Sequence, residues 1–285
     1  CNLVHQVSQQ LPIFTLSEIL GIPEEDRQKL VSWMEFLELA QYFTYEMIKE
    51  QNEGKTDSTP DPAMIDMFNA MVDEMFDYGR FILKSKRQNP SEDLLSAIAN
   101  AKIGDEKLTD EFLDGSWLLI IFAGNDTTRN TMSGGIKLLH ENQSQKDLLM
   151  NNLDLLPNFI NETVRCVSPV IHMRRTSLEE AEINGQKIGP YEKISLWYGA
   201  ANRDPDIFEN PDEFNILREN ADKHLAFGIG RHTCLGKPVA LMQLKEFYSQ
   251  FLTRFKDFEM NGDWKVAPNN FVHAIQEMPI KFTPE

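Results

Sequence analysis

The segment that most constrains this chain is residues 227–236, which read Phe-Gly-Ile-Gly-Arg-His-Thr-Cys-Leu-Gly. The pattern F-x-x-G-x-x-x-C-x-G arises by chance in roughly one such chain in a thousand. Its glycines let the backbone approach a flat ligand closely, and a helix starting after Cys234 would aim its N–H groups at the sulfur and stabilise a thiolate. A lone cysteine is usually a buried free thiol, but the full pattern predicts that Cys234 binds a metal ion.

A long helix with a polar middle is predicted over about 109–141, with Thr109 as its N-cap. Its middle, residues 123–128 (Ala-Gly-Asn-Asp-Thr-Thr), consists largely of poor helix formers, which predicts a distorted, functional turn. Asp126 beside Thr127 can supply protons to an otherwise apolar pocket. The alternative is a helix interrupted by solvent-facing polar residues, which the apolar stretch 118–122 makes less favourable.

The order of the predicted elements indicates a mainly α fold with a small β portion (α+β), as a single domain over residues 1–285. Helices are expected to end at Gly21, to begin at Pro23, to run from Ser91 to near Lys102, and to cover about 146–151, 157–166 and 238–255. An Asn-Gly turn within 182–188 predicts a hairpin. Further strands are expected at 193–198 and 278–282, with a long meander over 202–222.

Composition narrows the possible functions. The chain has 285 residues, of which 41% are hydrophobic, and its net charge of −16 without a basic block argues against a nucleic-acid partner. The sequence contains no run of about 18 apolar residues, so we expect no transmembrane helix. The three cysteines, Cys1, Cys166 and Cys234, form no C-x-x-C pair. A disulfide framework is therefore not expected, and a reducing, cytoplasmic setting fits better.

The glycine-cysteine segment resembles the haem-binding loop of the cytochrome P450 family. By that resemblance Cys234 is the proximal ligand of the iron of haem b, Phe227 packs near the thiolate, and His232 hydrogen-bonds a haem propionate. Gly228 and Gly236 would also lie against the cofactor. An axial thiolate pushes electron density onto the iron and favours O–O cleavage. The resemblance extends over essentially the whole chain, because the order and spacing of the other motifs match as well.

The polar middle of the long helix resembles the family's (A/G)-G-x-(D/E)-T signature. The resemblance implies that Ala123 and Gly124 border the haem and that the turn makes room for dioxygen. Thr127 would then donate a hydrogen bond on the oxygen-binding side, and Asp126 would relay protons from solvent. This pair distinguishes an enzyme from a haem carrier, because a carrier needs no proton relay.

The pattern E-x-x-R occurs twice, at Glu24–Arg27 and at Glu162–Arg165, and on its own carries little information. Only the second lies where the family has it, between the long helix and the cysteine loop. The resemblance makes it a buried structural pair tied to the meander, with Arg218 completing a Glu–Arg–Arg cluster. Glu24–Arg27 is expected to be a solvated surface pair.

Residues 168–176 resemble the family's strand that lines the pocket. Arg175 aligns with the propionate-binding arginine, since a guanidinium suits a carboxylate, and Arg174 is the alternative. The remaining expected pocket residues are Phe122, Val170, Ile171 and Phe271. The first residue is Cys1 rather than methionine. Because family members carry a further N-terminal portion, the chain is expected to be N-terminally truncated and its haem pocket to lack a wall.

The function implied by the resemblance is hydroxylation of an apolar small molecule (an alkane, fatty acid, terpenoid or sterol) by a soluble, monomeric monooxygenase. The enzyme would use dioxygen and electrons from NAD(P)H, delivered by a ferredoxin or similar donor. A basic cluster around the cysteine loop could dock an acidic ferredoxin, although ordinary surface side chains are an equal alternative: Lys223, Arg231, Lys237 and Lys245. The rival hypotheses are a haem-binding fragment without turnover and a haem-free helical interaction domain.

Overall fold

The computed structural model describes the backbone of residues 1–54, 61–269 and 271–283, and the side chains of these residues except 38–47 and 51. The chain forms two compact units. One consists of Gln9–Asp126, and the other of Cys1–Ser8 together with Thr127–Glu285. Among the described residues, no helix combines the length and apolar character needed to cross a membrane.

The unit Gln9–Asp126 is almost entirely helical. Its elements are α1 (Gln10–Leu20), the 3-10 turn η2 (Glu24–Asp26), α2 (Arg27–Asn52), α3 (Pro62–Gln88), α4 (Leu94–Asn100), the two-residue strands β1 (Lys102–Ile103) and β2 (Glu106–Lys107), and the first half of α5 (Asp110–Glu141). Helix α1 ends as predicted at Gly21, whose φ of 65° is the left-handed conformation that glycine adopts without a steric penalty. Thr109 caps α5 through its Oγ1, which accepts from the Phe112 N–H at 3.3 Å.

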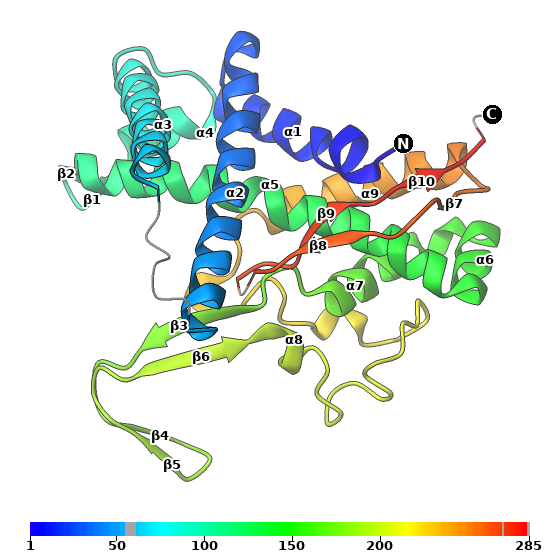
Figure 1. Cartoon of the computed structure of the whole chain (residues 1–285). Coiled ribbons are helices and arrows are strands. Elements are labelled where there is room, and N and C mark those ends of the chain that lie inside the picture. The colour runs from blue at the N-terminus through cyan, green and yellow to red at the C-terminus, as the bar shows by residue number, and fades with distance from the viewer. Residues whose placement is uncertain (55–60, 270, 284–285) are drawn as a thin grey trace. The chain divides into compact units, whose positions relative to one another are not determined.

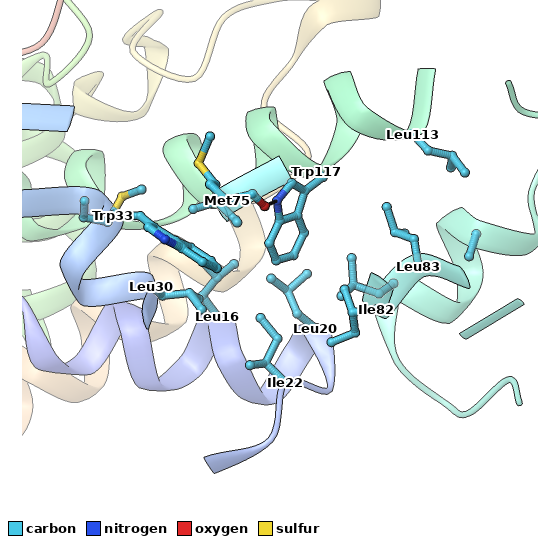
Figure 2. Close-up of a cluster of buried hydrophobic side chains, with 14 residues drawn as sticks. Leu16, Leu20, Ile22, Leu30, Trp33, Met75, Ile82, Leu83, Leu113 and Trp117 are labelled. Carbon is cyan, nitrogen blue, oxygen red and sulfur yellow. Dashed lines mark hydrogen bonds between the residues drawn. The ribbon is translucent and has the colours of Figure 1, made fainter. Parts of the chain in front are cut away.

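The core of this unit is built around two tryptophans. Trp33 of α2 and Trp117 of α5 are each 1% exposed and lie among leucine and isoleucine side chains (Figure 2). The indole Nε1 of Trp117 donates to the main-chain oxygen of Met75 at 2.9 Å, so its one polar group is satisfied inside the core. A Cβ at position 79 of α3 would overlap the Trp117 ring, so this position requires glycine.

Helix α4 is shorter than predicted at both ends. The helix expected to open at Ser91 begins at Leu94, because Asp93 is the N-cap and accepts from the Ser96 N–H at 2.7 Å. The Ser91 N–H instead donates to Ser96 Oγ at 3.0 Å. The helix ends at Asn100 rather than near Lys102, because Lys102 pairs with Lys107 in the β1–β2 hairpin.

The polar middle of α5 is not distorted, so that expectation is wrong. The helix stays α-helical through residues 123–128. Gly124 is needed there for packing rather than for a break, because a Cβ at this position would lie 2.9 Å from Leu16 Cδ1. Asn125 is fully buried, and its Nδ2 donates to Asp126 Oδ1 at 3.3 Å. Burial of these side chains outweighs their weak intrinsic helix propensity.

The unit of Cys1–Ser8 and Thr127–Glu285 mixes helices with short strands. Its helical elements are the π-helix η1 (Val4–Ser8), the second half of α5, α6 (Gln143–Asn151), η3 (Leu153–Leu155), α7 (Leu156–Val167), α8 (Tyr198–Ala201), η4 (Ala221–Lys223), η5 (Gly230–His232) and α9 (Lys237–Arg254). Its strands are β3 (His172–Thr176), β4 (Ala181–Ile183), β5 (Gln186–Ile188), β6 (Lys193–Trp197), β7 (Glu259–Met260), β8 (Lys265–Ala267), β9 (Ala274–Glu277) and β10 (Ile280–Lys281).

The strands of this unit pair in antiparallel twos: β3 with β6, β4 with β5, β7 with β10, and β8 with β9. The β4–β5 hairpin extends beyond the β3–β6 ladder (Figure 1). It turns at Asn184 and Gly185, with φ of 50° and 80°, which is the tight turn that the Asn-Gly pair predicted. Residues 202–222 run as the expected meander, with only η4 at their end.

Helices α5, α7 and α9 approach one another closely at two adjacent glycines of α5. A Cβ on Gly134 would lie 2.6 Å from Val167 Cγ2, and a Cβ on Gly135 would overlap Tyr248 Oη. Tyr248 is fully buried, and its hydroxyl donates to the main-chain oxygen of Thr131 at 2.7 Å. The Tyr248 side chain therefore has no space into which it could move away from a Cβ at position 135.

Alanine substitutions at two glycines of α5, Gly135 and Gly115, should change the free energy of unfolding in opposite directions. Gly135→Ala is expected to lower the free energy of unfolding by about 1–3 kcal/mol, because the new methyl group overpacks the buried Tyr248 hydroxyl. Gly115→Ala, at an exposed position in the first half of the same helix, is the matched control, since nothing lies within 4 Å of its Cβ position. It should stabilise by up to about 1 kcal/mol through helix propensity alone. Urea unfolding would measure both, and equal effects would contradict the packing argument.

Candidate functional site

Cys234 lies in a tight loop between η5 and α9. Its N–H donates to the main-chain oxygen of Phe227 at 2.8 Å, and its own oxygen accepts from the Lys237 N–H at 3.3 Å. Gly228 and Gly230 have φ of 70° and 72°, which a side chain would disfavour. The loop thus holds Cys234 at the start of α9, where the N–H groups of the helix stabilise negative charge on the sulfur.

The surroundings of Cys234 fit a flat apolar macrocycle. The cysteine is exposed, and the same loop exposes two apolar side chains, Ile229 and Leu235, which are 76% and 83% exposed. A Cβ on Gly236 would lie 3.8 Å from the Sγ, and none is present to obstruct it. In the described part of the chain no three His, Cys, Asp or Glu side chains gather as metal ligands.

Two side chains, those of His224 and Lys237, lie against the Phe227 ring of the loop. The Phe227 ring lies 5.7 Å from the ring of His224 and 5.4 Å from Lys237 Nζ. His224 is buried, and burial, reinforced by the Lys237 charge, lowers its pKa to about 4. The imidazole is therefore neutral at physiological pH, and its Nδ1 lies 3.3 Å from the Ala226 N, which donates to it.

The expected propionate-binding residues lie on two different elements. His232 is exposed at the end of η5. Arg175 is half-buried in β3 opposite Ile194, and its Nη1 donates to the main-chain oxygen of Arg174 at 2.9 Å. Arg174 is exposed, and because adjacent strand residues face opposite sides of a sheet, only one of the two arginines can face a given ligand.

Asp126 and Thr127 lie in mid-helix on α5. Asp126 is 5% exposed, and Thr127 is partly buried. The main-chain oxygen of Thr127 accepts from Thr131 Oγ1 at 2.7 Å. Ala123 is exposed, whereas Gly124 is half-buried against Leu16. The segment thus carries an acid next to an alcohol on a continuous helix.

Glu162, Arg165 and Arg218 form one buried cluster. Arg165 donates to both Glu162 carboxylate oxygens, at 2.7 and 2.8 Å, and Arg218 Nε donates to the same two at 3.0 and 3.1 Å. Glu162 and Arg165 are completely buried, and Arg218 is 7% exposed. Burial alone would raise the pKa of Glu162, but hydrogen bonds from Arg165, from the Asn215 N–H and from Arg218 lower it on balance.

The other E-x-x-R pattern does not form the expected pair. Arg27 makes its ion pair with Glu18 of α1 instead of with Glu24. The reason is local geometry: Glu24 lies in the 3-10 turn η2 and Arg27 is the first residue of α2, so they are not on one face of a continuous α-helix.

Sequence reasoning missed Asn202, which joins the charge cluster to the cysteine loop. Asn202 is fully buried, and its main-chain oxygen accepts from Arg165 Nη1 at 2.8 Å. Its Oδ1 accepts from the Leu225 N–H at 2.6 Å, and its Nδ2 donates to Ser168 Oγ at 2.8 Å. The segment 201–205 (Ala-Asn-Arg-Asp-Pro) resembles the family's meander, but only the structure shows that Asn202 is buried and makes these contacts.

Three of the four expected pocket residues come from two neighbouring segments. Val170 forms a bridge with Val272, and the Ile171 N–H donates to the main-chain oxygen of Phe271 at 2.8 Å. The Phe271 N–H is held in turn by Asn269 Oδ1 at 2.7 Å. The fourth expected residue is Phe122, which belongs to the half of α5 in the unit Gln9–Asp126.

Comparison with known proteins gives a consistent result. The family model described as "Cytochrome P450" matches residues 33–283. Linalool 8-monooxygenase of Pseudomonas putida is 32% identical over 100% of this chain and 66% of its own length. A steroid C26-monooxygenase of Mycolicibacterium smegmatis is 31% identical over 100% of this chain and 67% of its own length. The chain therefore spans about two thirds of the length of these relatives. A solved structure of CYP109E1 from Bacillus megaterium with testosterone has a TM-score of 0.81 and 30% identity, covering 99% of this chain and 72% of that one.

Proposed function

Since the chain belongs to the cytochrome P450 family and has its fold, we propose that it acts as a haem-thiolate monooxygenase on apolar small molecules. The observation that carries the proposal is the exposed Cys234, held at the start of α9 by a glycine loop that also exposes two apolar side chains. Neither a packing role nor a disulfide explains an exposed cysteine in that setting.

The haem would be held mainly by residues of one unit. Cys234 would bind the iron, Phe227 and Gly228 would pack beside the sulfur, and His232 and Arg175 would bind the propionates. A haem held through Cys234 would supply the capacity to bind and activate dioxygen. The loop's own contribution is to hold the sulfur at the start of α9, through the Cys234 N–H that donates to the main-chain oxygen of Phe227.

The proton for this chemistry would come from α5. Asp126 is an acid in a nearly buried position, and Thr127 is an alcohol next to it on the same helix. Asp126 would take up a proton from solvent, and Thr127 Oγ1 would pass one toward the bound oxygen substrate. The buried Asn125 amide would orient the Asp126 carboxylate through their hydrogen bond.

The relay is tested by Asp126→Asn and Thr127→Ala. Each is expected to lower product formation by about a hundredfold, the lower end of what positioned proton transfer contributes, while NAD(P)H consumption continues. Thr128→Ala is the matched control, because Thr128 is the neighbouring threonine outside the proposed relay. Product per NAD(P)H consumed is the quantity to measure. Normal coupling in both variants would refute the relay, and a haem-bound parent protein without any product would favour a haem-binding chain without turnover.

The substrate class we propose is terpenoid, steroid or alkyl-chain compounds. Two of the relatives are named for hydroxylating linalool and a steroid, and CYP109E1 is solved with testosterone. The side chains of Val170, Ile171 and Phe271 are apolar, which suits such compounds better than polar ones. A spectral titration with a terpenoid, a steroid and a fatty acid would identify which class displaces the water at the iron.

For the electron donor we propose a ferredoxin that is reduced by NAD(P)H. Arg231 is exposed within the cysteine loop, Lys223 is exposed four residues before it and Lys245 is exposed on α9, in a chain whose net charge is −16. Such a local basic group on an acidic protein would steer an acidic partner to the haem side. Reduction rates that fall with rising salt, and fall further in a Lys223→Glu variant, would support this docking mode.

A further inference from the structure

Three oxidisable side chains lie in ring contact inside the unit Gln9–Asp126. They are Trp33 of α2, Tyr78 of α3 and Trp117 of α5. The ring centroids are 5.4 Å apart for Trp33 and Tyr78, 5.8 Å for Tyr78 and Trp117, and 6.3 Å for the two tryptophans. The two indoles lie side by side within the core in Figure 2. Indole and phenol lose an electron more readily than aliphatic side chains, and rings at these distances are close enough to exchange one.

The phenol of Tyr78 has a proton acceptor at the edge of this group. Its hydroxyl donates to Asp26 Oδ2 at 2.9 Å, and Lys29 Nζ binds the other oxygen of Asp26 at 2.7 Å. The side chains of Asp26 and Lys29 are 23% and 45% exposed, so the pair reaches solvent. Burial, followed by the hydrogen bond to Asp26, raises the pKa of Tyr78, so the phenol is protonated before it reacts.

Lys29 decides how Tyr78 can be oxidised. Its Nζ lies 4.9 Å from the centre of the Tyr78 ring. A cation over a ring opposes positive charge on that ring. A positive charge on the Tyr78 ring is therefore unfavourable. Tyr78 loses an electron only if its phenolic proton leaves at the same time. Asp26 accepts the hydrogen bond of that phenol and is therefore the nearest group that can receive its proton, while the hydrogen bond from Lys29 lowers the pKa of Asp26.

We propose that Trp117, Trp33 and Tyr78 form a one-electron relay that carries oxidising equivalents from the core to the Tyr78–Asp26 pair at the surface. A photogenerated ruthenium(III) polypyridyl complex removes an electron from an indole and becomes ruthenium(II), and the indole radical cation then takes an electron from Tyr78 and returns to neutral indole. The phenolic O–H bond breaks as the proton passes to the Asp26 carboxylate, which leaves a neutral tyrosyl radical and a protonated Asp26. A thiolate in solution restores Tyr78 by giving up one electron and becoming a thiyl radical, while the protonated Asp26 returns its proton to the phenolic oxygen.

The relay can be tested without haem, so its failure is distinguishable from failure of the proposed monooxygenase function. In the full chain, Cys1, Cys166 and Cys234 are replaced by serine, and Gly115→Cys carries a ruthenium polypyridyl photo-oxidant. Gly115 is exposed on α5, two residues before Trp117, and its Cβ position is open. After illumination with an electron acceptor, freeze-quench electron paramagnetic resonance and transient absorption identify the radical and its rate of formation.

The relay predicts a tyrosyl radical in the parent chain, formed more slowly in deuterium oxide. Tyr78→Phe should replace it with a tryptophanyl radical. Asp26→Asn keeps an oxygen that can accept the hydrogen bond from Tyr78 but removes the carboxylate that can take up the proton. The yield of tyrosyl radical should therefore fall several-fold, and its rate of formation should no longer depend on deuterium oxide. Tyr191→Phe is the matched control, since Tyr191 is 76% exposed and belongs to the other unit. An unchanged tyrosyl signal in Tyr78→Phe, no effect of Asp26→Asn, or no radical on any of the three side chains would overturn the proposal.

Discussion

Cys234→Ala is expected to abolish the red-shifted Soret band of the reduced, CO-bound protein, and with it all monooxygenase turnover. The reason is that this band and the O–O cleavage chemistry both depend on an axial thiolate. Cys234 is exposed at the start of α9, where its sulfur is accessible to a ligand. The measurement is the difference spectrum of the haem-loaded full chain, with product formation assayed on the same samples.

Cys166→Ala is the matched control for that experiment. Burial, with the nearby Glu162 carboxylate, raises the pKa of Cys166 to about 12, so it remains a thiol at neutral pH. It lies at the end of α7, with its Sγ 3.2 Å from Arg165 Nη2. Its removal should leave the CO spectrum unchanged. A retained band in Cys234→Ala, or a band lost in Cys166→Ala but not in Cys234→Ala, would show that the assignment of the iron ligand is wrong.

Glu162→Gln should destabilise the protein by about 3–5 kcal/mol, because it leaves two buried guanidinium groups without their counter-charge. Glu162 is the only carboxylate that Arg165 and Arg218 share among the described ion pairs. Glu259→Gln is the matched control, since the Glu259–Lys281 pair is 56% and 59% exposed and should contribute no more than about 1 kcal/mol. Urea unfolding of parent and variants measures both. Similar losses from the two substitutions would contradict the role given to the buried cluster.

The stabilising effect of Glu162 should also depend on pH in a defined direction. The pKa of Glu162 is lowered in the folded state, so the unfolded chain binds a proton more readily as the pH falls. The contribution is therefore fully present above the unfolded pKa of about 4.3 and is lost as the pH drops toward the folded value. The stability difference between parent and Glu162→Gln should be constant near neutral pH and shrink in acid. A difference that grew on acidification would show that the sign is wrong.

Part of the candidate site follows from local sequence rules. The glycines around Cys234, the helix that starts after it, the turn at Asn184 and Gly185, and the end of α1 at Gly21 all depend on backbone conformations that particular residue types allow or require. Such preferences act over a few residues, so they are visible without knowledge of the fold. The family resemblance in these segments likewise rests on short motifs.

The contacts that only the tertiary structure determined join residues that lie far apart in the chain. Arg165 reaches main-chain oxygens 37 and 46 residues away, and Asn202 binds Leu225 and Ser168 across 23 and 34 residues. Packing kept α5 helical through its poor helix formers and gave Arg27 the partner Glu18 rather than Glu24. Sequence patterns record the preference of a residue for a local conformation, whereas burial and pairing depend on which distant side chains fill the same space. The cysteine loop was therefore predictable, and the polar contacts that hold it in place were not.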